Sequence, residues 1–307
     1  MNVFDNREAQ AMLIADLKDP FDSEDYLYEL KFDGIRLLAY VDENKTDLRN
    51  KRNKELTPIF PELKNLHQYV KKKCILDGEL IVFKNGKPDF YEVQKRAMMT
   101  NLFKIDILIQ KNHASYIVYD ILYIEDHLLI EETIENRKEI LNQIIEENSY
   151  IAISKVHDKG IALFGLVKQL ELEGVVAKRR KSQYFFGKRT KDWIKFKLLE
   201  DDDFIICGYI PKQNQMISII LGQYSKEKEL IYKGHCSLGC SYSLLKQYPF
   251  KKINHAPFNI YPNGNEEAIW LQPELVCIVE YMPSEKGLRQ PVFKGIRDDK
   301  SSSDCIE

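Results

Sequence analysis

The sequence lacks any long apolar run. Its 307 residues include no stretch of the roughly 20 apolar residues that a membrane-spanning helix needs. The first residues, MNVFDNREAQ, carry acidic side chains and no apolar segment of the kind found in secretory signals. We therefore expect a chain that has no membrane partner and no export signal and that works in the cytoplasm.

Clustered metal ligands are also missing. The only close cysteine pair, Cys236 and Cys240, has no second pair at a spacing typical of zinc sites, and the 6 histidines form no i, i+4 pair on a helix. This pattern argues against a zinc centre. We expect free thiols in a reducing compartment, at positions 74, 207, 236, 240, 277 and 305.

The common phosphate-binding signatures do not occur either. The sequence has no GxxxxGK[ST] loop, no GxGxxG before a helix, and no HRD or DFG triplet. A P-loop NTPase and a protein kinase both depend on such segments to hold phosphates and metal. Neither class is supported.

The composition that remains is that of a folded chain long enough for two domains, with 44% hydrophobic and 30% charged residues. Apolar positions from 131 to 148 and from 160 to 172 recur at helical spacing. The runs that predict strands are 26–41, 74–83, 115–124, GVVAK at 174–178 and WIKFK at 193–197. Because βαβ repetition is missing, we expect an α+β domain of largely antiparallel sheets over residues 1–199.

The composition changes after Leu199. The acidic run EDDD at 200–203 has few apolar residues to hold a rigid interface, so it predicts a hinge. Beyond it, short strands are expected at 203–210, 216–224, 229–234 and 275–282, with a short helix near 241–248. Such a succession of strands is typical of a small OB-fold β-barrel, here over residues 200–307.

The segment YELKFDGIR at 28–36 alternates between apolar and charged residues. Because side chains in a strand point to opposite faces with a period of two, Glu29, Lys31 and Asp33 should share one face. Gly34 follows, where a strand can turn. Taken alone, this pattern fits a solvated strand edge as well as a functional site, and for Asp33 a structural role is as plausible as any other.

Similar polar faces recur on other predicted strands. Asp77 and Glu79 share a face in ILDGEL, Lys195 and Lys197 share one in WIKFK, and a further glutamate precedes the strand that carries Lys178. Each face alone is more typical of an exposed strand. Together they supply carboxylates that recruit Mg²⁺ and lysines that neutralise phosphates. A lysine among other cations also loses its proton more easily and becomes a nucleophile, so the set favours nucleotidyl transfer.

Although the net charge is −2, the segment between residues 178 and 197 is strongly basic. Asp192 is its only acid, and aromatic residues are interleaved with its cations, which favours a folded anion-binding surface over a disordered tail. The basic residues are Lys178, Arg179, Arg180, Lys181, Lys188, Arg189, Lys191, Lys195 and Lys197. Lys251 and Lys252 are further candidates for phosphate contacts.

KFDGIR at 31–36 resembles the KxDGxR motif of the covalent nucleotidyltransferases, which include ATP-dependent DNA ligases, RNA ligases and mRNA capping enzymes. The final segment, in the form RxPxF…RxDK, looks especially like the ligase module of bacterial multifunctional end-joining ligases. Capping enzymes usually place threonine after the motif lysine, where this chain has Phe32. The other motifs follow in family order: RNKELT at 52–57, LDGEL at 76–80, YIVYDIL at 116–122, LEGVVAKR at 172–179, WIKFK at 193–197 and LRQPVFKGIRDDK at 288–300.

The resemblance implies roles in nucleotide binding. Lys31 would attack the α-phosphate of ATP and hold AMP as a phosphoramidate. Glu29 would read the adenine edge, and Tyr119 would stack on the base. Arg36 would bind near the sugar and the entering phosphate, and Arg52 would hold the nucleotide or the 5′-phosphate of the nick.

It also implies roles for metal and phosphate. Glu173 would bind Mg²⁺ or Mn²⁺, and Glu79 would contact the ribose or the metal. Contacts with ATP phosphates are expected from Lys178, Arg189, Lys195 and Lys197. The leaving pyrophosphate would be oriented by Arg289, Arg297, Asp298 and Lys300 of the second domain, which would close on the first domain for this step only.

The predicted enzyme is a monomeric ATP-dependent DNA ligase that acts on nicked duplex DNA. Lys51 stands where a serine is common, and it adds a DNA phosphate contact or changes nothing. The segment DFYEVQKR at 89–96 resembles a ligase segment, so Gln94 and Arg96 face DNA or are structural. An RNA ligase or guanylyltransferase, a non-catalytic OB-fold protein, the biological pathway and an end-joining partner protein all stay open.

Overall fold

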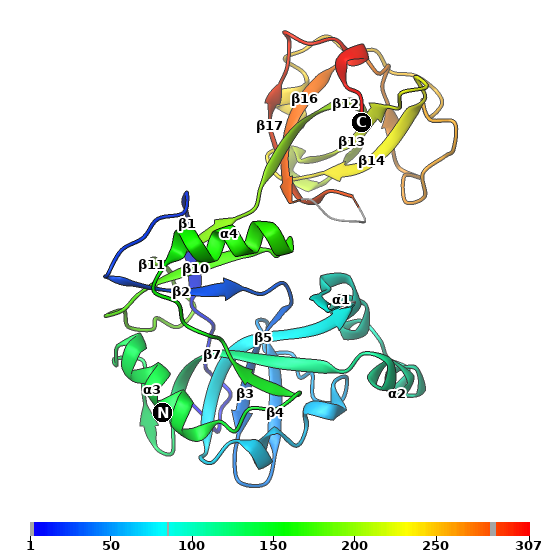
Figure 1. Ribbon diagram of the computed structural model, residues 1–307. Coiled ribbons are helices and arrows are strands. Elements are labelled where there is room, and N and C mark those ends of the chain that lie inside the picture. The colour runs from blue at the N-terminus through cyan, green and yellow to red at the C-terminus, as the bar shows by residue number, and fades with distance from the viewer. Residues whose placement is uncertain (1–2, 85, 283–286) are drawn as a thin grey trace. The chain divides into compact units, whose positions relative to one another are not determined.

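The computed structural model describes residues 3–84, 86–282 and 287–307 (Figure 1). The chain divides into two compact units, Met1–Lys197 and Leu198–Glu307. None of the helices in the described ranges has both the length and the apolar character needed to cross a membrane. Sheets dominate both units and few helices accompany them, so the predicted α+β class is confirmed.

The larger sheet of the first unit has 7 strands in the order β4-β3-β5-β7-β8, with β6 beside β5 and β9 beside β7. All of its pairs are antiparallel except β7 with β9. Its inner face packs on a core that includes Leu76, Tyr116 and Val118. The strands are β3 (Ile35–Val41), β4 (Thr46–Asn50), β5 (Cys74–Lys84), β6 (Lys87–Pro88), β7 (Ala114–Ile124), β8 (His127–Leu128) and β9 (Ile151–Ile153).

The smaller sheet of this unit has 4 strands in the order β1-β11-β10-β2. One of its faces packs against helix α4 through a cluster that includes Tyr28, Phe164 and Phe196. Tyr26, Leu163, Val167, Val175, Ala177 and Ile194 complete the buried part of that cluster. The alternating partners on these strands, among them Glu29 and Lys31, must therefore point to the opposite face. The strands are β1 (Leu13–Leu17), β2 (Tyr26–Lys31), β10 (Gly174–Arg179) and β11 (Arg189–Lys197).

Three α-helices of the first unit begin at polar caps. Asp89, Asn101 and Thr133 each accept a hydrogen bond from a backbone N–H of the first helical turn, which satisfies a donor that the helix leaves unpaired. The α-helices are α1 (Phe90–Ala97), α2 (Leu102–Lys111), α3 (Ile134–Ile144) and α4 (Gly160–Leu170), with 3-10 turns at Pro61–Leu63 and Leu66–Tyr69. The strand pattern expected for 26–41 divides into β2 and β3 at the segment that contains Gly34.

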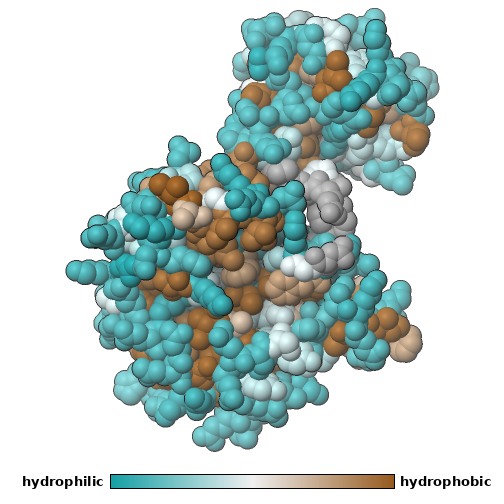
Figure 2. All heavy atoms as spheres, viewed as in Figure 1, coloured by the Kyte–Doolittle hydropathy of each residue, from teal (hydrophilic) through white to brown (hydrophobic). Residues whose placement is uncertain are grey.

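Helix α1 settles one alternative left by the sequence. Gln94 is exposed, but Arg96 is 1% exposed, lies 2.5 Å from Glu62 and stacks on Phe60. Arg96 therefore has a structural role and does not face DNA. The neighbouring helix α2 has a single buried residue, and Figure 2 shows hydrophobic side chains on its surface.

The second unit is a six-stranded sheet in the order β14-β13-β12-β16-β17, with β15 beside β12. The sheet curls until Leu238, just after β14, bridges to Val292 of β17, which closes a barrel. This is the OB-fold architecture that the sequence predicted, and its strands are β12 (Glu200–Pro211), β13 (Ile217–Tyr224), β14 (Leu230–Cys236), β15 (Ile269–Trp270), β16 (Val276–Met282) and β17 (Arg289–Ile296). Helix α5 (Tyr242–Leu245) and the 3-10 turns Gln213–Gln215 and Ser302–Asp304 complete it.

The prediction of a hinge at 200–203 is wrong. These four acidic residues form the start of β12 and pair in antiparallel register with Tyr281, Glu280, Val279 and Ile278 of β16. Strand pairing is supplied by backbone groups, so a run of acids can belong to a rigid sheet when its side chains reach water or cations. Only Leu198 and Leu199 lie between the end of β11 and the start of β12.

Candidate active site

Strand register places the candidate residues in two rows on one face of the smaller sheet. Lys31 of β2 lies opposite Gly174 of β10, which lies opposite Lys197 of β11. In the next row along that face, Glu29 lies opposite Val176, which lies opposite Lys195. Gly174, the partner of Lys31, directly follows Glu173, so the same row also brings Glu173 close to Lys31. This register explains how motifs far apart in the chain come together.

Two glycines allow the close backbone approaches that the site requires. A Cβ atom on Gly174 would lie 2.1 Å from the carbonyl oxygen of Phe196, and one on Gly34 would lie 2.3 Å from the carbonyl oxygen of Leu80. Real Cβ atoms do not approach backbone atoms this closely, so any larger residue would push the strands apart. Gly174 keeps Glu173 next to Lys31, and Gly34 lets β3 turn away after the lysine.

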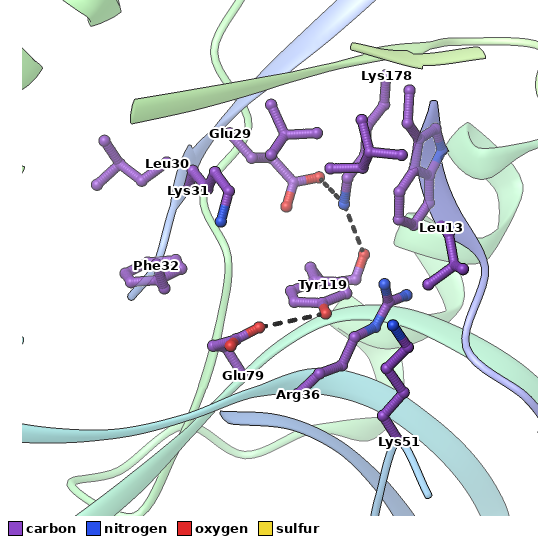
Figure 3. Close-up of a pocket in the computed structure, with 13 residues that line it drawn as sticks. Leu13, Glu29, Leu30, Lys31, Phe32, Arg36, Lys51, Glu79, Tyr119 and Lys178 are labelled. Carbon is purple, nitrogen blue, oxygen red and sulfur yellow. Dashed lines mark hydrogen bonds and ion pairs between the residues drawn. The ribbon is translucent and has the colours of Figure 1, made fainter. Parts of the chain in front are cut away.

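The face with Glu29 and Lys31 lines a cavity of about 270 Å³ (Figure 3). Arg36 of β3, Glu79 of β5 and Tyr119 of β7 reach it from the larger sheet. Leu13, Ile14, Leu30, Phe32, Lys51, Val176, Lys178 and Trp193 complete the lining. The cavity thus lies between the two sheets of the first unit, with charged groups on both sides.

Lys31 lies between two carboxylates. Its Nζ is 2.8 Å from each carboxylate oxygen of Glu173, and the charge of Glu79 also acts on it. Burial alone would lower the pKa of Lys31, but Glu173 and Glu79 outweigh burial and raise it. The expectation that neighbouring cations lower the pKa of Lys31 is therefore wrong. The effect does contribute to Lys195 and Lys197, whose pKa values are lowered by burial and by nearby lysines.

Glu79 carries the most perturbed carboxyl group of the cavity. Burial raises its pKa to about 8, and the negative charges of Glu173 and Asp77 add to this effect. Tyr119 donates a long hydrogen bond of 3.5 Å to its Oε2. Near neutral pH this carboxyl therefore holds a proton in part of the molecules, which a cation entering beside it would displace.

Arg36 is fixed by a buried aspartate on the neighbouring strand. Its Nη2 and Nε lie 2.5 and 3.0 Å from the carboxylate oxygens of Asp77, and its Nη1 donates to the Met12 carbonyl. Tyr184 donates to the same carboxylate at 2.7 Å. The guanidinium lies 5.4 Å from the centre of the Tyr119 ring. Asp77 thus orients an arginine toward the ring of Tyr119, a role that sequence reasoning missed.

Lys178 does not lie where its predicted contact with a phosphate would place it. Its Nζ is 3.0 Å from Glu29 Oε1 and 4.6 Å from the centre of the Tyr119 ring (Figure 3). Lys178 and Gly174, the partner of Lys31, lie toward opposite ends of β10. Burial lowers its pKa to about 8. This position belongs with the groups expected at the base, so phosphate contact is not what its geometry favours.

The basic segment is neutralised over part of its length. Arg179 pairs with Asp192, and Arg180 pairs with Glu135 and Asp158. Lys178 and Lys197 have carboxylate partners inside the site. Arg189 donates to the Ile14 carbonyl at 2.9 Å. The segment therefore offers fewer free cations than its composition indicates: Lys181, Lys188 and Lys191 are exposed.

The turn after β4 brings a different cation to the cavity from the one expected. Lys51 lines it, whereas the neighbouring Arg52 is exposed and is not among the lining residues. Neither observation identifies a ligand for Arg52, whose role stays a prediction.

In the second unit, the cations of the last motif share an acidic partner. Arg297 Nη1 lies 3.2 Å from Asp203, and the Lys300 ammonium also contacts Asp203. Arg297 makes a further pair with Asp299 at 2.7 Å. Arg289 begins β17. The last acid of EDDD thus positions two of the cations that sequence reasoning assigned to pyrophosphate.

Lys138 of α3 is the buried functional candidate that sequence reasoning did not single out. Its Nζ lies 2.8 Å from Glu29 Oε1, and its side chain is 8% exposed. A signal was present, because position 138 lies four residues after Ile134 and three before Leu141, on the apolar stripe of the helix. A lysine on such a stripe needs a buried partner.

Comparison with known families matches both units. The model of the ATP dependent DNA ligase domain matches residues 9–197, and that of the ATP dependent DNA ligase C terminal region matches residues 212–300. The first match alone covers more than half of the chain.

Curated relatives agree with the domain matches. DNA ligase C1 of Mycolicibacterium smegmatis is 30% identical over 95% of this chain and 90% of its own length. The SPbeta prophage-derived DNA ligase-like protein LigB of Bacillus subtilis is 34% identical over 66% of this chain and 72% of its own length. The multifunctional non-homologous end joining protein LigD of Pseudomonas aeruginosa is 30% identical over 90% of this chain, which spans 34% of that protein.

Solved structures show the same fold. Mycobacterial DNA ligase D complexed with ATP has a TM-score of 0.58 at 24% identity, with 98% of each chain covered. A structure from an analysis of Lig E DNA ligases has a TM-score of 0.64 at 15% identity and covers 94% of this chain.

Proposed function

The chain belongs to the ATP-dependent DNA ligase family, and from this membership and the cavity around Lys31 we propose that it seals nicks in duplex DNA. The substrate ends are a 5′-phosphate and a 3′-hydroxyl, and the reaction runs through a lysyl-AMP intermediate and a DNA-adenylate. We propose that residues 1–199 form the adenylation domain and that residues 200–307 form the OB-fold domain. Six buried free cysteines suit the reducing cytoplasm, where we propose that the chain acts as a monomer.

The observation that carries the proposal is the placement of one lysine. Lys31 lines a cavity in which Glu29 is suited to the base edge of ATP and Tyr119 to the base face. Lys195 and Lys197 are not among the lining residues, but strand register places them on the same face of the sheet as Lys31, where they are suited to phosphates. A solvated strand edge, the alternative left by the sequence, would leave these side chains in water. Glu29 is 1% exposed and Glu173 is 6% exposed, so they are not surface charges.

In the first step, Lys31 must lose its contact with Glu173 and one proton to solvent before its amine can react. The nitrogen then bonds to the α-phosphorus of ATP and releases a second proton, the bond from that phosphorus to the bridging oxygen breaks, and pyrophosphate leaves. Lys195 and Lys197, with their lowered pKa values, can share a proton and charge with the departing phosphates.

The second and third steps reuse the same phosphorus chemistry. An oxygen of the nick 5′-phosphate attacks the AMP phosphorus, the phosphorus–nitrogen bond breaks, and Lys31 takes up a proton. The 3′-hydroxyl then attacks the 5′-phosphorus, loses its proton, and releases AMP as the phosphodiester forms.

A divalent cation fits this site through its donor set. Glu79 and Glu173 would hold Mg²⁺ or Mn²⁺ together with phosphate oxygens, since these ions are often bound by one or two carboxylates plus substrate phosphates. No cage of three or more Asp, Glu, His or Cys side chains occurs in the parts of the chain that the structure describes, which agrees with a cation shared with substrate. When bound, the cation would neutralise phosphate charge.

The test is covalent labelling with Lys31→Ala. Wild-type protein incubated with α-labelled ATP and Mg²⁺ should carry label through a denaturing gel and should seal a 5′-phosphorylated nick with ATP alone. The variant should do neither, whereas Lys45→Ala, an exposed lysine outside the cavity, should behave as wild type. A labelled band of normal intensity in Lys31→Ala would reject the assignment, and labelling with sealing of RNA but not DNA would favour an RNA ligase.

A further inference from the structure

Three side chains from three elements form a buried charge cluster at the base end of the cavity. Lys138 of α3 and Lys178 of β10 both donate to the same oxygen, Oε1 of Glu29 on β2, at 2.8 and 3.0 Å. The exposed fractions of the three side chains are 8%, 3% and 2%. Lys138 also donates to the Ser154 carbonyl at 3.3 Å, which fixes its own position.

The other oxygen of this carboxylate meets no donor with full hydrogen-bond geometry among the described residues, although the Ser154 hydroxyl interacts with the same carboxylate and helps to lower its pKa. Glu29 Oε2 is buried, and Figure 3 shows the carboxylate pointing into the cavity between Lys31 and Lys178. A buried acceptor without a donor is costly, so native proteins rarely keep one unless a ligand or water completes it. An amine donor on a ligand would complete this one.

The two lysines also keep the carboxylate ionised. Burial alone would raise the pKa of Glu29, but the charges of Lys138 and Lys178 outweigh burial and lower it. An ionised carboxylate only accepts hydrogen bonds. It can pair with the 6-amino group of adenine and repels the 6-oxo group of guanine.

We propose that Lys138 is a positioning residue for base selection, which holds Glu29 Oε1 with Lys178 so that Oε2 is a fixed acceptor for the 6-amino group of ATP. This inference rests on the proposed function, because it concerns the nucleotide that Lys31 uses. Lys138 touches no nucleotide itself and acts only through Glu29. Lys178 lines the cavity, whereas Lys138 is not among the lining residues and reaches Glu29 from helix α3, outside the two sheets.

The first experiment replaces Lys138 by Met, which keeps the length of the side chain and removes its charge. Without Lys138 the carboxylate of Glu29 can rotate and can take up a proton, which it could donate to guanine. We expect the ratio of kcat/KM for ATP over GTP in lysine labelling to fall by roughly tenfold or more, mainly through KM for ATP. Lys138→Arg keeps the charge and should restore much of the ratio.

A second variant does not depend on how well Lys138→Met folds. In Glu29→Gln, the amide oxygen should take the place of Oε1, because Lys138 and Lys178 can only donate. The amide NH₂ must then face the base, where it can donate to the 6-oxo group of guanine. We expect the preference to shift toward GTP by roughly a hundredfold, and we expect Lys138→Met in the Glu29→Gln background to reduce this shift, since the amide can then turn over.

Arg96→Met is the matched control. Arg96 is a buried cation of the same unit, lies 2.5 Å from Glu62 and is absent from the cavity lining. It should lower stability, as Lys138→Met does, without changing the ATP/GTP ratio. An unchanged ratio in Lys138→Met, or a Glu29→Gln protein that still prefers ATP as strongly as wild type, would overturn the inference.

Equilibrium binding of ATP and GTP in EDTA separates this inference from the proposed function. If wild type binds ATP over GTP but forms no lysine adduct, the ligase proposal fails, and the ATP/GTP binding ratio of Lys138→Met then decides the inference: a lower ratio than in wild type supports it and an unchanged ratio overturns it. If wild type forms the adduct and Lys138→Met keeps full selectivity in both assays, only the inference fails. If wild type binds neither nucleotide, both fail.

Discussion

The ammonium nitrogen of Lys31 lies 2.8 Å from both carboxylate oxygens of Glu173. The lysine that we propose as the nucleophile is therefore held in a charged, hydrogen-bonded form. Such a lysine cannot attack phosphorus, because its lone pair carries a proton. Reaction requires that Glu173 turn to another cation and leave Lys31 free, so ligand binding and activation of the nucleophile are coupled.

Glu173→Gln and Glu79→Gln should fold but lose most sealing activity. Each removes one of the two carboxylates that we propose hold the divalent cation, and losing a charge-stabilising contact costs on the order of a hundredfold in rate. Sealing rates across a Mg²⁺ titration are the measurement. Glu62→Gln, a buried carboxylate paired with Arg96, is the control. Wild-type rates with unchanged Mg²⁺ dependence in both site variants would contradict the metal assignment.

Arg297→Ala and Lys300→Ala should fail in one step only. Pyrophosphate departs when ATP reacts and is already gone when AMP moves to DNA, so cations that orient it matter for the first step alone. We expect little lysine labelling with ATP but near-normal sealing of a nick that already carries 5′-AMP. Single-turnover assays with the two substrates measure this difference.

Asp203→Asn refines the same prediction. It removes the carboxylate that both Arg297 and Lys300 contact, and leaves both cations in place. If Asp203 positions them, the variant should lose labelling in the same step, although less completely. Equal losses with both substrates in all three variants would mean that these residues act on DNA or on stability.

The sequence was sufficient to predict which residues share a face. Strand alternation placed Glu29 with Lys31, and the register between β2, β10 and β11 then brought Lys195 and Lys197 to the same face. This succeeded because a period of two is a local property of the backbone. Strands β12, β13, β14 and β16 of the second unit were found for the same reason, since short alternating segments separated by turns define them, whereas β15 and β17 were not predicted as strands.

Partners across elements could not be predicted in this way. Alternation shows that Lys178 faces the cavity, but only packing against Tyr119 and Glu29 decides that it lies at the base. The hinge expected at Asp203 and its neighbours failed for a related reason. The charge of a side chain says little about backbone pairing when a cation from elsewhere in the unit, such as Arg297 just after β17, neutralises that charge.

Binding of nicked DNA should weaken as salt rises, but less steeply than the full basic segment would produce. Lys188→Ala combined with Lys191→Ala should reduce the slope of log K against log salt by about two, since each phosphate contact contributes roughly 0.9. Arg180→Ala should leave the slope unchanged, because Glu135 and Asp158 already pair with it. If the slope of log K against log salt is the same in wild type and in the double lysine variant, this segment is not the main DNA contact.

The pH dependence of stability should report the buried state of Lys178. Burial lowers the pKa of Lys178 from 10.5 to about 8 in the folded chain. Below about pH 8 the folded protein must keep a charged lysine in a buried place, which costs stability in full. As pH rises from about 8 toward 10.5, the folded chain releases this proton before the unfolded chain does, so the cost disappears and the free energy of unfolding rises.

Lys178→Met removes that contribution, so the difference in stability between the variant and wild type should change steadily across this window. Urea unfolding of both proteins at pH 7.5, 8.5 and 9.5 measures it, because wild type should gain stability relative to the variant with each step in pH. Lys181 is an exposed lysine of the same segment, so the free energy of unfolding of Lys181→Met should change with pH as that of wild type does. If the stability of Lys178→Met also changes with pH as that of wild type does, Lys178 titrates as an ordinary lysine and burial does not oppose its charge.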